Sequence, residues 1–271
     1  MADRSFKLAM IQMRVAPGDK TNNLRHAGEL VAAAAGQGAQ VVVLPEAMPA
    51  GWTDSSSATL ADEVPHGETC RFLANLAVTH RLFLCSGVVE RNGNHVFNTA
   101  VLLGPDGELL LHHRKIHELE IGHDCYAQGD RLGVAQTSLG CIGVMICADA
   151  FAPGQVISRT LGLMGADIIL SPCAWAVPPA HDNVKEPYGQ LWRDNYGPVA
   201  RDFRLWVAGV SNVGPITSGP WTGRKCIGCS MLVGPDGEVI LQGPYGENAE
   251  TILYADVQLK FGRRGRAGAP K

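Results

Sequence analysis

The chain has 271 residues, of which 46% are hydrophobic and 18% are charged, and its formal net charge at pH 7 is −3. A chain of this length can bury the core of one large domain, and its hydrophobic share is too high for a disordered protein. The near-neutral charge argues against nucleic acid as the main partner. No apolar stretch is long enough to predict a membrane span, and none predicts a secretory signal.

The first half of the sequence predicts strands and helices that alternate and end in a hairpin. The helix expected over residues 20–35 places Leu24, Ala27 and Val31 on one apolar stripe at helical spacing. Residues 41–44 are apolar without alternation, as in a strand that is covered on both faces. The strands are predicted over residues 7–13, 41–44, 82–89, 96–103 and 108–114.

The second half repeats this order of elements. Residues 165–172 resemble residues 38–45, and residues 231–239 resemble residues 101–109 around a shared Pro-Asp-Gly turn. The shared order of the two matches argues against chance recurrence. Helices are predicted over residues 155–164 and 188–203, and strands over residues 141–146, 168–170, 205–210, 227–233 and 238–242.

This internal repeat predicts the fold. Two half-units, each a sheet with helices on one face, can bury their bare faces against each other. We therefore expect an α/β protein, a four-layer α-β-β-α sandwich built from two pseudo-symmetric half-units. It is expected to be a single domain over residues 1–260, followed by a basic Gly/Arg-rich tail over residues 261–271.

Three chemically capable side chains follow the ends of predicted strands. Glu46 comes after the apolar run 41–44, Lys115 closes the first hairpin, and Cys147 follows Ile146. Loops at strand ends are where a rigid sheet can hold reactive groups. A thiolate can attack an amide carbon while a carboxylate takes its proton. An ammonium and the backbone N–H of Ala148 can then stabilise the oxyanion, at about 3–4 kcal/mol per donor.

The sequence around these residues resembles the nitrilase, or carbon–nitrogen hydrolase, superfamily from Phe6 to Asp256. The resemblance rests on Leu44-Pro45-Glu46, on Arg114-Lys115-Ile116-His117, and on Gly143-Val144-Met145-Ile146-Cys147-Ala148-Asp149. It implies that the glutamate is the general base, the lysine supports the oxyanion and the cysteine is the nucleophile. It also implies the α-β-β-α sandwich and a homodimer or higher homo-oligomer.

Two departures from the family pattern matter. Nitrile-hydrolysing members often carry Trp-Glu after the cysteine and many amidases carry Tyr-Asp, whereas this chain has Ala148-Asp149. The family's second glutamate usually precedes an aromatic-x-x-Gly, and no glutamate stands at its place here. Glu120 is the preferred substitute, with Glu118 as the alternative.

Residues that line the substrate pocket are harder to identify. Trp175 follows a strand end in the second half as Glu46 does in the first, and Tyr126 and Trp52 lie in predicted loops. These three are candidate substrate-binding residues, with ordinary packing as the alternative for each. The carbamoylase branch carries an arginine after the cysteine, and Phe151-Ala152-Pro153 offers none.

Other motifs predict neither a metal nor a cofactor. Cys226 and Cys229 have the spacing of a zinc or redox pair, but no second pair completes a tetrahedral site. On a strand, His113 and His117 would lie ~13 Å apart, too far to grip one ion. The sequence has no Gly-x-Ser-x-Gly, phosphate loop or dinucleotide fingerprint.

Together these features predict a cysteine-dependent amidase that acts on a small amide and water through a thioester, without a cofactor or metal. A nitrilase and an N-carbamoyl amide hydrolase are the alternatives within this chemistry, and a ligand-binding protein that retains the fold is the non-enzyme alternative. The eight cysteines, without a predicted signal, indicate a reducing compartment, so a cytoplasmic location is expected.

Overall fold

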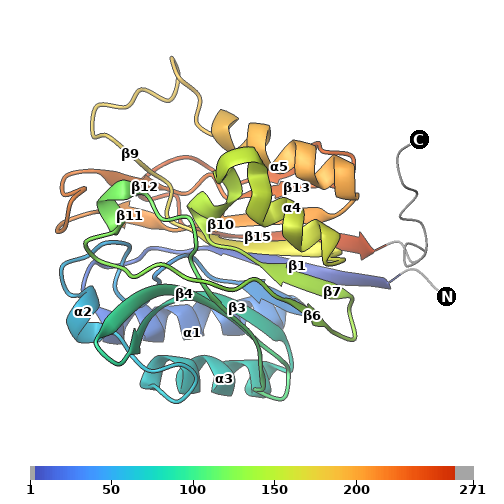
Figure 1. The fold of residues 1–271 in the computed structure, drawn as a ribbon, viewed down its shortest axis with the longest axis horizontal. Helices are drawn as coiled ribbons and strands as arrows, with labels where there is room; N and C mark the ends of the chain where they lie inside the picture. Colours follow the sequence, from blue (N-terminus) through green and yellow to red (C-terminus); the bar gives the residue numbers. More distant parts are fainter. Residues whose placement is uncertain (1–3, 260–271) are drawn as a thin grey trace.

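The computed structural model describes residues 4–259, and within that range two six-stranded sheets pack face to face (Figure 1). In spatial order, the first sheet contains β15 (Thr251–Leu259), β1 (Arg4–Gln12), β2 (Val41–Val43), β3 (Phe83–Asn92), β4 (His95–Leu103) and β5 (Leu109–Arg114). The second contains β14 (Val239–Gln242), β13 (Met231–Val233), β10 (Trp206–Ser211), β8 (Ile168–Cys173), β7 (Cys141–Val144) and β6 (Val134–Gln136).

Helices form the two outer layers of the molecule. The first sheet is covered by α1 (Lys20–Gly36) and α3 (Glu68–His80), and the second by α4 (Val156–Leu163) and α5 (Gln190–Phe203) (Figure 1). This arrangement confirms the predicted four-layer α-β-β-α sandwich. Short helices α2 (Ser57–Leu60), η1 (Glu120–Gly122), η2 (Cys147–Phe151) and η3 (Pro153–Gln155) lie in the connections.

The internal repeat is visible in the order of the strands. Parallel strands β1, β2 and β3 run into the hairpin of β4 and β5, and parallel strands β7, β8 and β10 run into the hairpin of β13 and β14. Each half also gains an antiparallel edge strand, β15 beside β1 and β6 beside β7. The two half-units therefore share one topology, as the repeat predicts.

The predicted strand over residues 227–233 is wrong, because the chain bends in the middle of it. Gly228 and Cys229 both adopt positive φ angles, 67° and 59°. A Cβ at position 228 would lie 2.2 Å from the side-chain amide of Gln12, so the close approach requires glycine. The segment is split into β13 and β12 (Lys225–Ile227), which joins β11 (Val213–Pro215) and β9 (Ala176–Val177) in a small third sheet.

The main apolar core lies between the two large sheets. It contains side chains from both, such as Leu8 and Val43 of the first and Ile142 and Leu170 of the second. A second cluster, which includes Leu24 and Leu73, packs α1 and α3 on the first sheet. Among residues 4–259 the structure has no helix that is long and apolar enough to cross a membrane. The predicted tail over residues 261–271 lies outside the described residues.

Candidate active site

Glu46 lies just beyond β2, in a turn that is closely packed against neighbouring strands. Its amide donates a hydrogen bond to the carbonyl of Cys173 at the end of β8, at 3.2 Å. On the other side, a Cβ added to Gly87 would lie 2.5 Å from the Cα of Glu46. The glycine lets β3 pass this close, so the backbone that carries the Glu46 carboxylate has little room to move.

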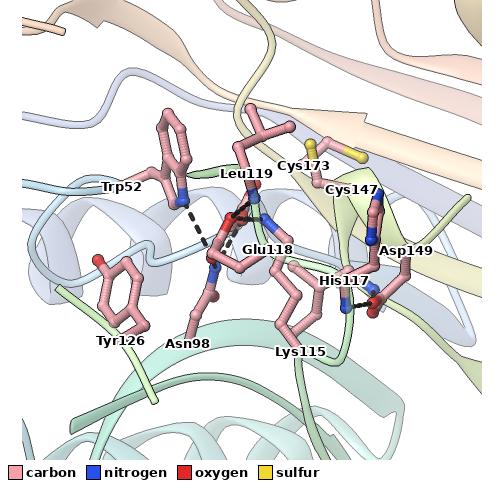
Figure 2. Close-up of polar contacts among 12 residues, drawn as sticks. Trp52, Asn98, Lys115, His117, Glu118, Leu119, Tyr126, Cys147, Asp149 and Cys173 are labelled. Atoms are coloured by element: carbon pink, nitrogen blue, oxygen red, sulfur yellow. Dashed lines mark hydrogen bonds and ion pairs between the residues drawn. The ribbon is translucent and has the colours of Figure 1, made fainter. Parts of the chain in front are cut away.

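Lys115 connects two carboxylates inside the protein. It is the first residue after β5, and its amide bonds to the carbonyl of Asn98 on β4 at 2.8 Å. Its Nζ lies 2.7 Å from Oε1 of Glu46. The same Nζ lies 2.7 Å from Oε1 of Glu118 (Figure 2). The side chains are 2%, 1% and 4% exposed, respectively. Two buried carboxylates thus share one ammonium.

Asn98 completes this arrangement from the middle of β4. Its Nδ2 donates to Oε1 of Glu46 at 2.7 Å and to Oε2 of Glu118 at 3.0 Å. The other oxygen of Glu46, Oε2, is buried and has no hydrogen-bond partner within residues 4–259. One oxygen of Glu46 is therefore fixed by two donors, and the other is open to receive a proton.

Cys147 begins η2, and Met145 and Ile146 separate it from the end of β7. It has a φ of 43°, an uncommon conformation for a residue with a side chain, and it is 8% exposed. Its amide donates to Oγ of Ser171 on β8 at 3.2 Å. Ala148, whose amide follows the thiol, is fully buried. This sharp turn holds the thiol at the end of the sheet.

Asp149 connects the turn that carries Cys147 to the loop that follows Lys115. One of its oxygens accepts the amide of Ile146 at 2.9 Å. The other accepts the amides of Ile116 and His117 at 3.1 and 2.8 Å. The residues adjoining Cys147 and Lys115 are thus held by a single buried carboxylate.

Burial dominates the electrostatics of the site. It raises the pKa of Glu46 above its ordinary value, and the negative charge of Glu118 adds to the rise against the opposing charge of Lys115. Burial would lower the pKa of Lys115, but Glu46 and Glu118 hold it well above its usual range. Burial, a hydrogen bond with Cys173 and the charge of Glu46 raise the pKa of the Cys147 thiol. The resting thiol therefore keeps its proton until a base takes it.

The structure distinguishes the two candidates for the second carboxylate. Glu118 is buried against Lys115, whereas Glu120 is exposed in η1. The preference for Glu120 therefore gives way to Glu118, because the chain turns inward directly after Lys115. The sequence signal was proximity alone: a glutamate three residues after a lysine can reach the same ammonium when the intervening loop is tight.

The candidate pocket residues occupy different surroundings. Trp52 lies beside the site, with the Lys115 Nζ 5.4 Å from its ring and its Nε1 3.5 Å from Oε2 of Glu118. The hydroxyl of Tyr126 is bonded to the amide of Thr53 at 3.0 Å. Trp175 is buried and stacks on Trp192 at 4.5 Å between ring centroids.

The structure also shows where the cysteines and histidines of the possible metal or redox motifs lie. Cys226 lies on β12 within an apolar cluster, and Cys229 is buried beyond the bend that follows it. His113 faces Asp149, and the ring of His117 packs edge-on against Phe151. Within residues 4–259 no group of three or more His, Cys, Asp or Glu side chains is arranged to hold a metal ion.

Comparisons with known proteins relate this geometry to known families. A sequence model described as carbon-nitrogen hydrolase matches residues 7–267. The chain is 32% identical to a nitrilase of Pyrococcus abyssi over 265 residues, which cover 96% of this chain and 92% of that protein. It is 31% identical to an omega-amidase of Danio rerio over 271 residues, with coverage of 94% and 89%. A solved carbon-nitrogen hydrolase from Helicobacter pylori superposes with a TM-score of 0.81 at 25% identity, over 93% of this chain and 89% of that chain.

Proposed function

Because the chain belongs to the carbon–nitrogen hydrolase family, a family of cysteine-dependent enzymes, we propose that it is an amidase in which Cys147 is the nucleophile, Glu46 the general base and Lys115 the oxyanion donor. The observation that carries this assignment is the unpartnered Oε2 of Glu46, beside an ammonium and close enough to Cys147 for its charge to raise the thiol's pKa.

The first half-reaction forms a thioester. Glu46 takes the proton of the Cys147 thiol as sulfur attacks the amide carbon, so no resting thiolate is needed. Lys115 and the amide of Ala148 stabilise the negative charge that develops on the carbonyl oxygen. The protonated Glu46 then gives its proton to the departing amine, and ammonia or an amine leaves.

The second half-reaction hydrolyses the thioester. Glu46 is again a carboxylate and removes a proton from water as the water attacks the thioester carbon. Glu118 keeps Lys115 in place through its 2.7 Å contact, while Asn98 fixes the oxygen of Glu46 that takes no proton. The products are a carboxylic acid and the restored thiol.

A small amide is the substrate class that we propose, with nitriles and N-carbamoyl compounds as the alternatives. The relatives support an amide, because several are omega-amidases, while the Pyrococcus abyssi relative is a nitrilase. The alternatives differ in the substrates that they accept, since a nitrilase releases acid and ammonia from nitriles and leaves amides unchanged.

We also propose a cytoplasmic homo-oligomer. The eight cysteines are free thiols, which suits a reducing compartment. The outer layer exposes large apolar side chains on neighbouring helices, with Leu163 at the end of α4 78% exposed and Leu191 on α5 51% exposed. Burying them against a second copy would remove apolar surface from water. Light scattering of the wild type and of Leu163→Glu tests this proposal.

An ammonia-release screen across small amides, nitriles and N-carbamoyl compounds tests the proposed chemistry. We expect release from amides, and a loss of at least about a thousandfold in Cys147→Ala and Glu46→Gln. Cys85→Ala, which removes another buried thiol, is the matched control and should stay active. Activity that survives in Cys147→Ala would show that another group is the nucleophile.

A labelling experiment distinguishes the enzyme from a binding protein that retains the fold. Iodoacetamide should alkylate Cys147 in the wild type, and Glu46→Gln should slow that labelling because the base is lost. Labelling of the half-buried Cys125 should be the same in both proteins. Equal rates at Cys147 in the two proteins would contradict the role of Glu46.

A further inference from the structure

A second thiol lies beside Cys147, and the proposed hydrolysis does not use it. Strands β7 and β8 are parallel neighbours in a register that pairs Ile142 with Ile168 and Val144 with Leu170. Beyond the paired residues the chain turns at Cys147, and the amide of Cys147 bonds to Oγ of Ser171, two residues before Cys173. Figure 2 shows the two sulfur atoms side by side at the ends of these segments.

The contacts around Cys173 fix the position of its thiol. This thiol donates to the carbonyl oxygen of Ser171 at 3.2 Å, and its nearness contributes to the raised pKa of the Cys147 thiol. Ser171 anchors both residues, since its Oγ accepts the amide of Cys147 at 3.2 Å and lies 3.5 Å from the sulfur of Cys173. The hydroxyl of Tyr196 lies 3.7 Å from that sulfur. Cys173 is fully buried, whereas Cys147 is 8% exposed.

We propose that Cys173 is a resolving thiol, which captures Cys147 as a disulfide when a hydroperoxide oxidises the nucleophile. The inference rests on the proposed function only in requiring that Cys147 is a reactive thiol with Glu46 as its base. It identifies the pair Cys147–Cys173 as a reversible oxidation site.

The chemistry takes two balanced steps. Glu46 removes the thiol proton, the sulfur of Cys147 attacks the outer oxygen of the hydroperoxide, and the O–O bond breaks to give a sulfenic acid and an alcohol, or water from hydrogen peroxide. The sulfur of Cys173 then attacks the sulfenyl sulfur, and the hydroxyl leaves as water with the proton of Cys173. Two thiols have lost two electrons and two protons, and one hydroperoxide has been reduced.

The backbone around the pair is anchored. Cys147 lies in η2, beyond the paired residues of β7, and its amide is held at 3.2 Å by Ser171, two residues before Cys173 on β8. Disulfides join residues whose Cα atoms are about 4.4–6.8 Å apart. While the disulfide exists, Cys147 cannot attack a substrate, and its sulfur is protected from further oxidation to sulfinic acid.

Mass spectrometry of the oxidised full-length chain tests the proposal. After treatment with hydrogen peroxide, tryptic peptides 132–159 and 160–185 should appear cross-linked, with fragmentation placing the bond at Cys147 rather than at Cys141. Dithiothreitol should restore the free thiols and the activity together. In Cys173→Ala and Cys173→Ser, peroxide should instead convert Cys147 to sulfinic acid, and dithiothreitol should restore neither.

Cys85→Ala is the matched control, because Cys85 is also a buried strand cysteine in the core between the sheets. It should form the cross-link as the wild type does. Irreversible oxidation of Cys147 at the same rate in the wild type and in both Cys173 variants would overturn the proposal. The cross-link is detected by mass and does not depend on an activity assay. If the protein hydrolyses amides but forms no cross-link, the resolving role of Cys173 is refuted and the proposed amidase function is not. If the cross-link forms but no amide is hydrolysed, the resolving role of Cys173 is supported and the amidase function is refuted.

Discussion

The side chain of His113 donates a hydrogen bond from Nε2 to Oδ2 of Asp149 at 2.7 Å, and both side chains are buried. Asp149 also holds the amide of Ile146 on the same oxygen and the amides of Ile116 and His117 on the other. The strand before Lys115, the loop after it and the residue before Cys147 therefore meet at one carboxylate, which sets the spacing of the proposed nucleophile and oxyanion donor.

Replacing this carboxylate should slow the chemical step more than it weakens substrate binding. In Asp149→Asn the new amide cannot accept on both sides, so the Cys147 turn and the Lys115 loop lose their common anchor. We expect kcat to fall about tenfold or more with a smaller change in KM, and stability to fall by about 1–3 kcal/mol. Steady-state kinetics and urea unfolding measure the two effects. Asp167→Asn, which neutralises the carboxylate that accepts the amide of Cys141 at the start of β7, is the control and should spare kcat. A normal kcat in a destabilised Asp149→Asn would show that the carboxylate serves the fold only.

The acid limb of the pH profile should depend on Glu118. A general base must be ionised, so activity should be lost as pH falls through the pKa of Glu46, which burial and the charge of Glu118 raise above its ordinary value. Glu118→Gln removes one negative charge and should move the limb of kcat/KM to lower pH. Glu120→Gln changes an exposed neighbour and should leave the profile in place. A limb that moves in Glu120→Gln and not in Glu118→Gln would favour Glu120 as the second carboxylate.

Glu90 should stabilise the fold above acidic pH. Burial would raise its pKa, but hydrogen bonds from His112, Arg114 and Thr99 lower it to about 2. Because the folded-state pKa lies below that of the unfolded chain, the stabilisation is present above the unfolded pKa and is lost as pH falls toward about 2. We expect Glu90→Gln to lower the free energy of unfolding at neutral pH by about 1–3 kcal/mol. Its stability should also change less between about pH 5 and about pH 2. Chemical denaturation across this range measures both, and parallel curves for the two proteins would contradict the role of Glu90.

A methyl group at position 87 should displace the backbone of Glu46 without changing its carboxylate. The added Cβ would lie 2.5 Å from the Cα of Glu46 and 2.6 Å from the carbonyl oxygen of Pro45, closer than packed atoms allow. We expect Gly87→Ala to cost about 1–3 kcal/mol of stability and most of the activity. Gly36→Ala, where a Cβ meets nothing within 4 Å, is the control. Crystal structures of both variants would show whether Glu46 has moved, and an unmoved, fully active site would contradict the tight contact.

The fold could be predicted from the sequence because its main signals are local. Apolar strands, amphipathic helices and repeated turns follow from neighbouring residues, and the match of the two halves then gave the layers. The bend at Gly228 and Cys229 was missed because the contact that demands it comes from Gln12, at the other end of the chain.

The candidate site was predictable only in part, for a related reason. Glu46, Lys115 and Cys147 each follow a strand, and strand ends converge in any such sheet. Asn98 sits inside β4 with no sequence signal, because its importance comes from the two carboxylates that fold beside it. The burial of Glu118 depends on the path of a loop, which spacing along the chain does not determine.

Among residues 4–259, the repeat also explains why the two half-units do not carry the same reactive side chains. When the two sheets are matched strand by strand through their registers, Cys147 corresponds to Met13, a buried thioether that cannot act as a thiolate nucleophile. In the same way, Glu46 corresponds to Cys173, and the amide of Glu46 donates a hydrogen bond to the carbonyl of Cys173 at 3.2 Å. In the proposed site, the first half-unit contributes Glu46 and Lys115, and the second contributes Cys147. Neither half-unit expressed by itself would therefore hold all three side chains.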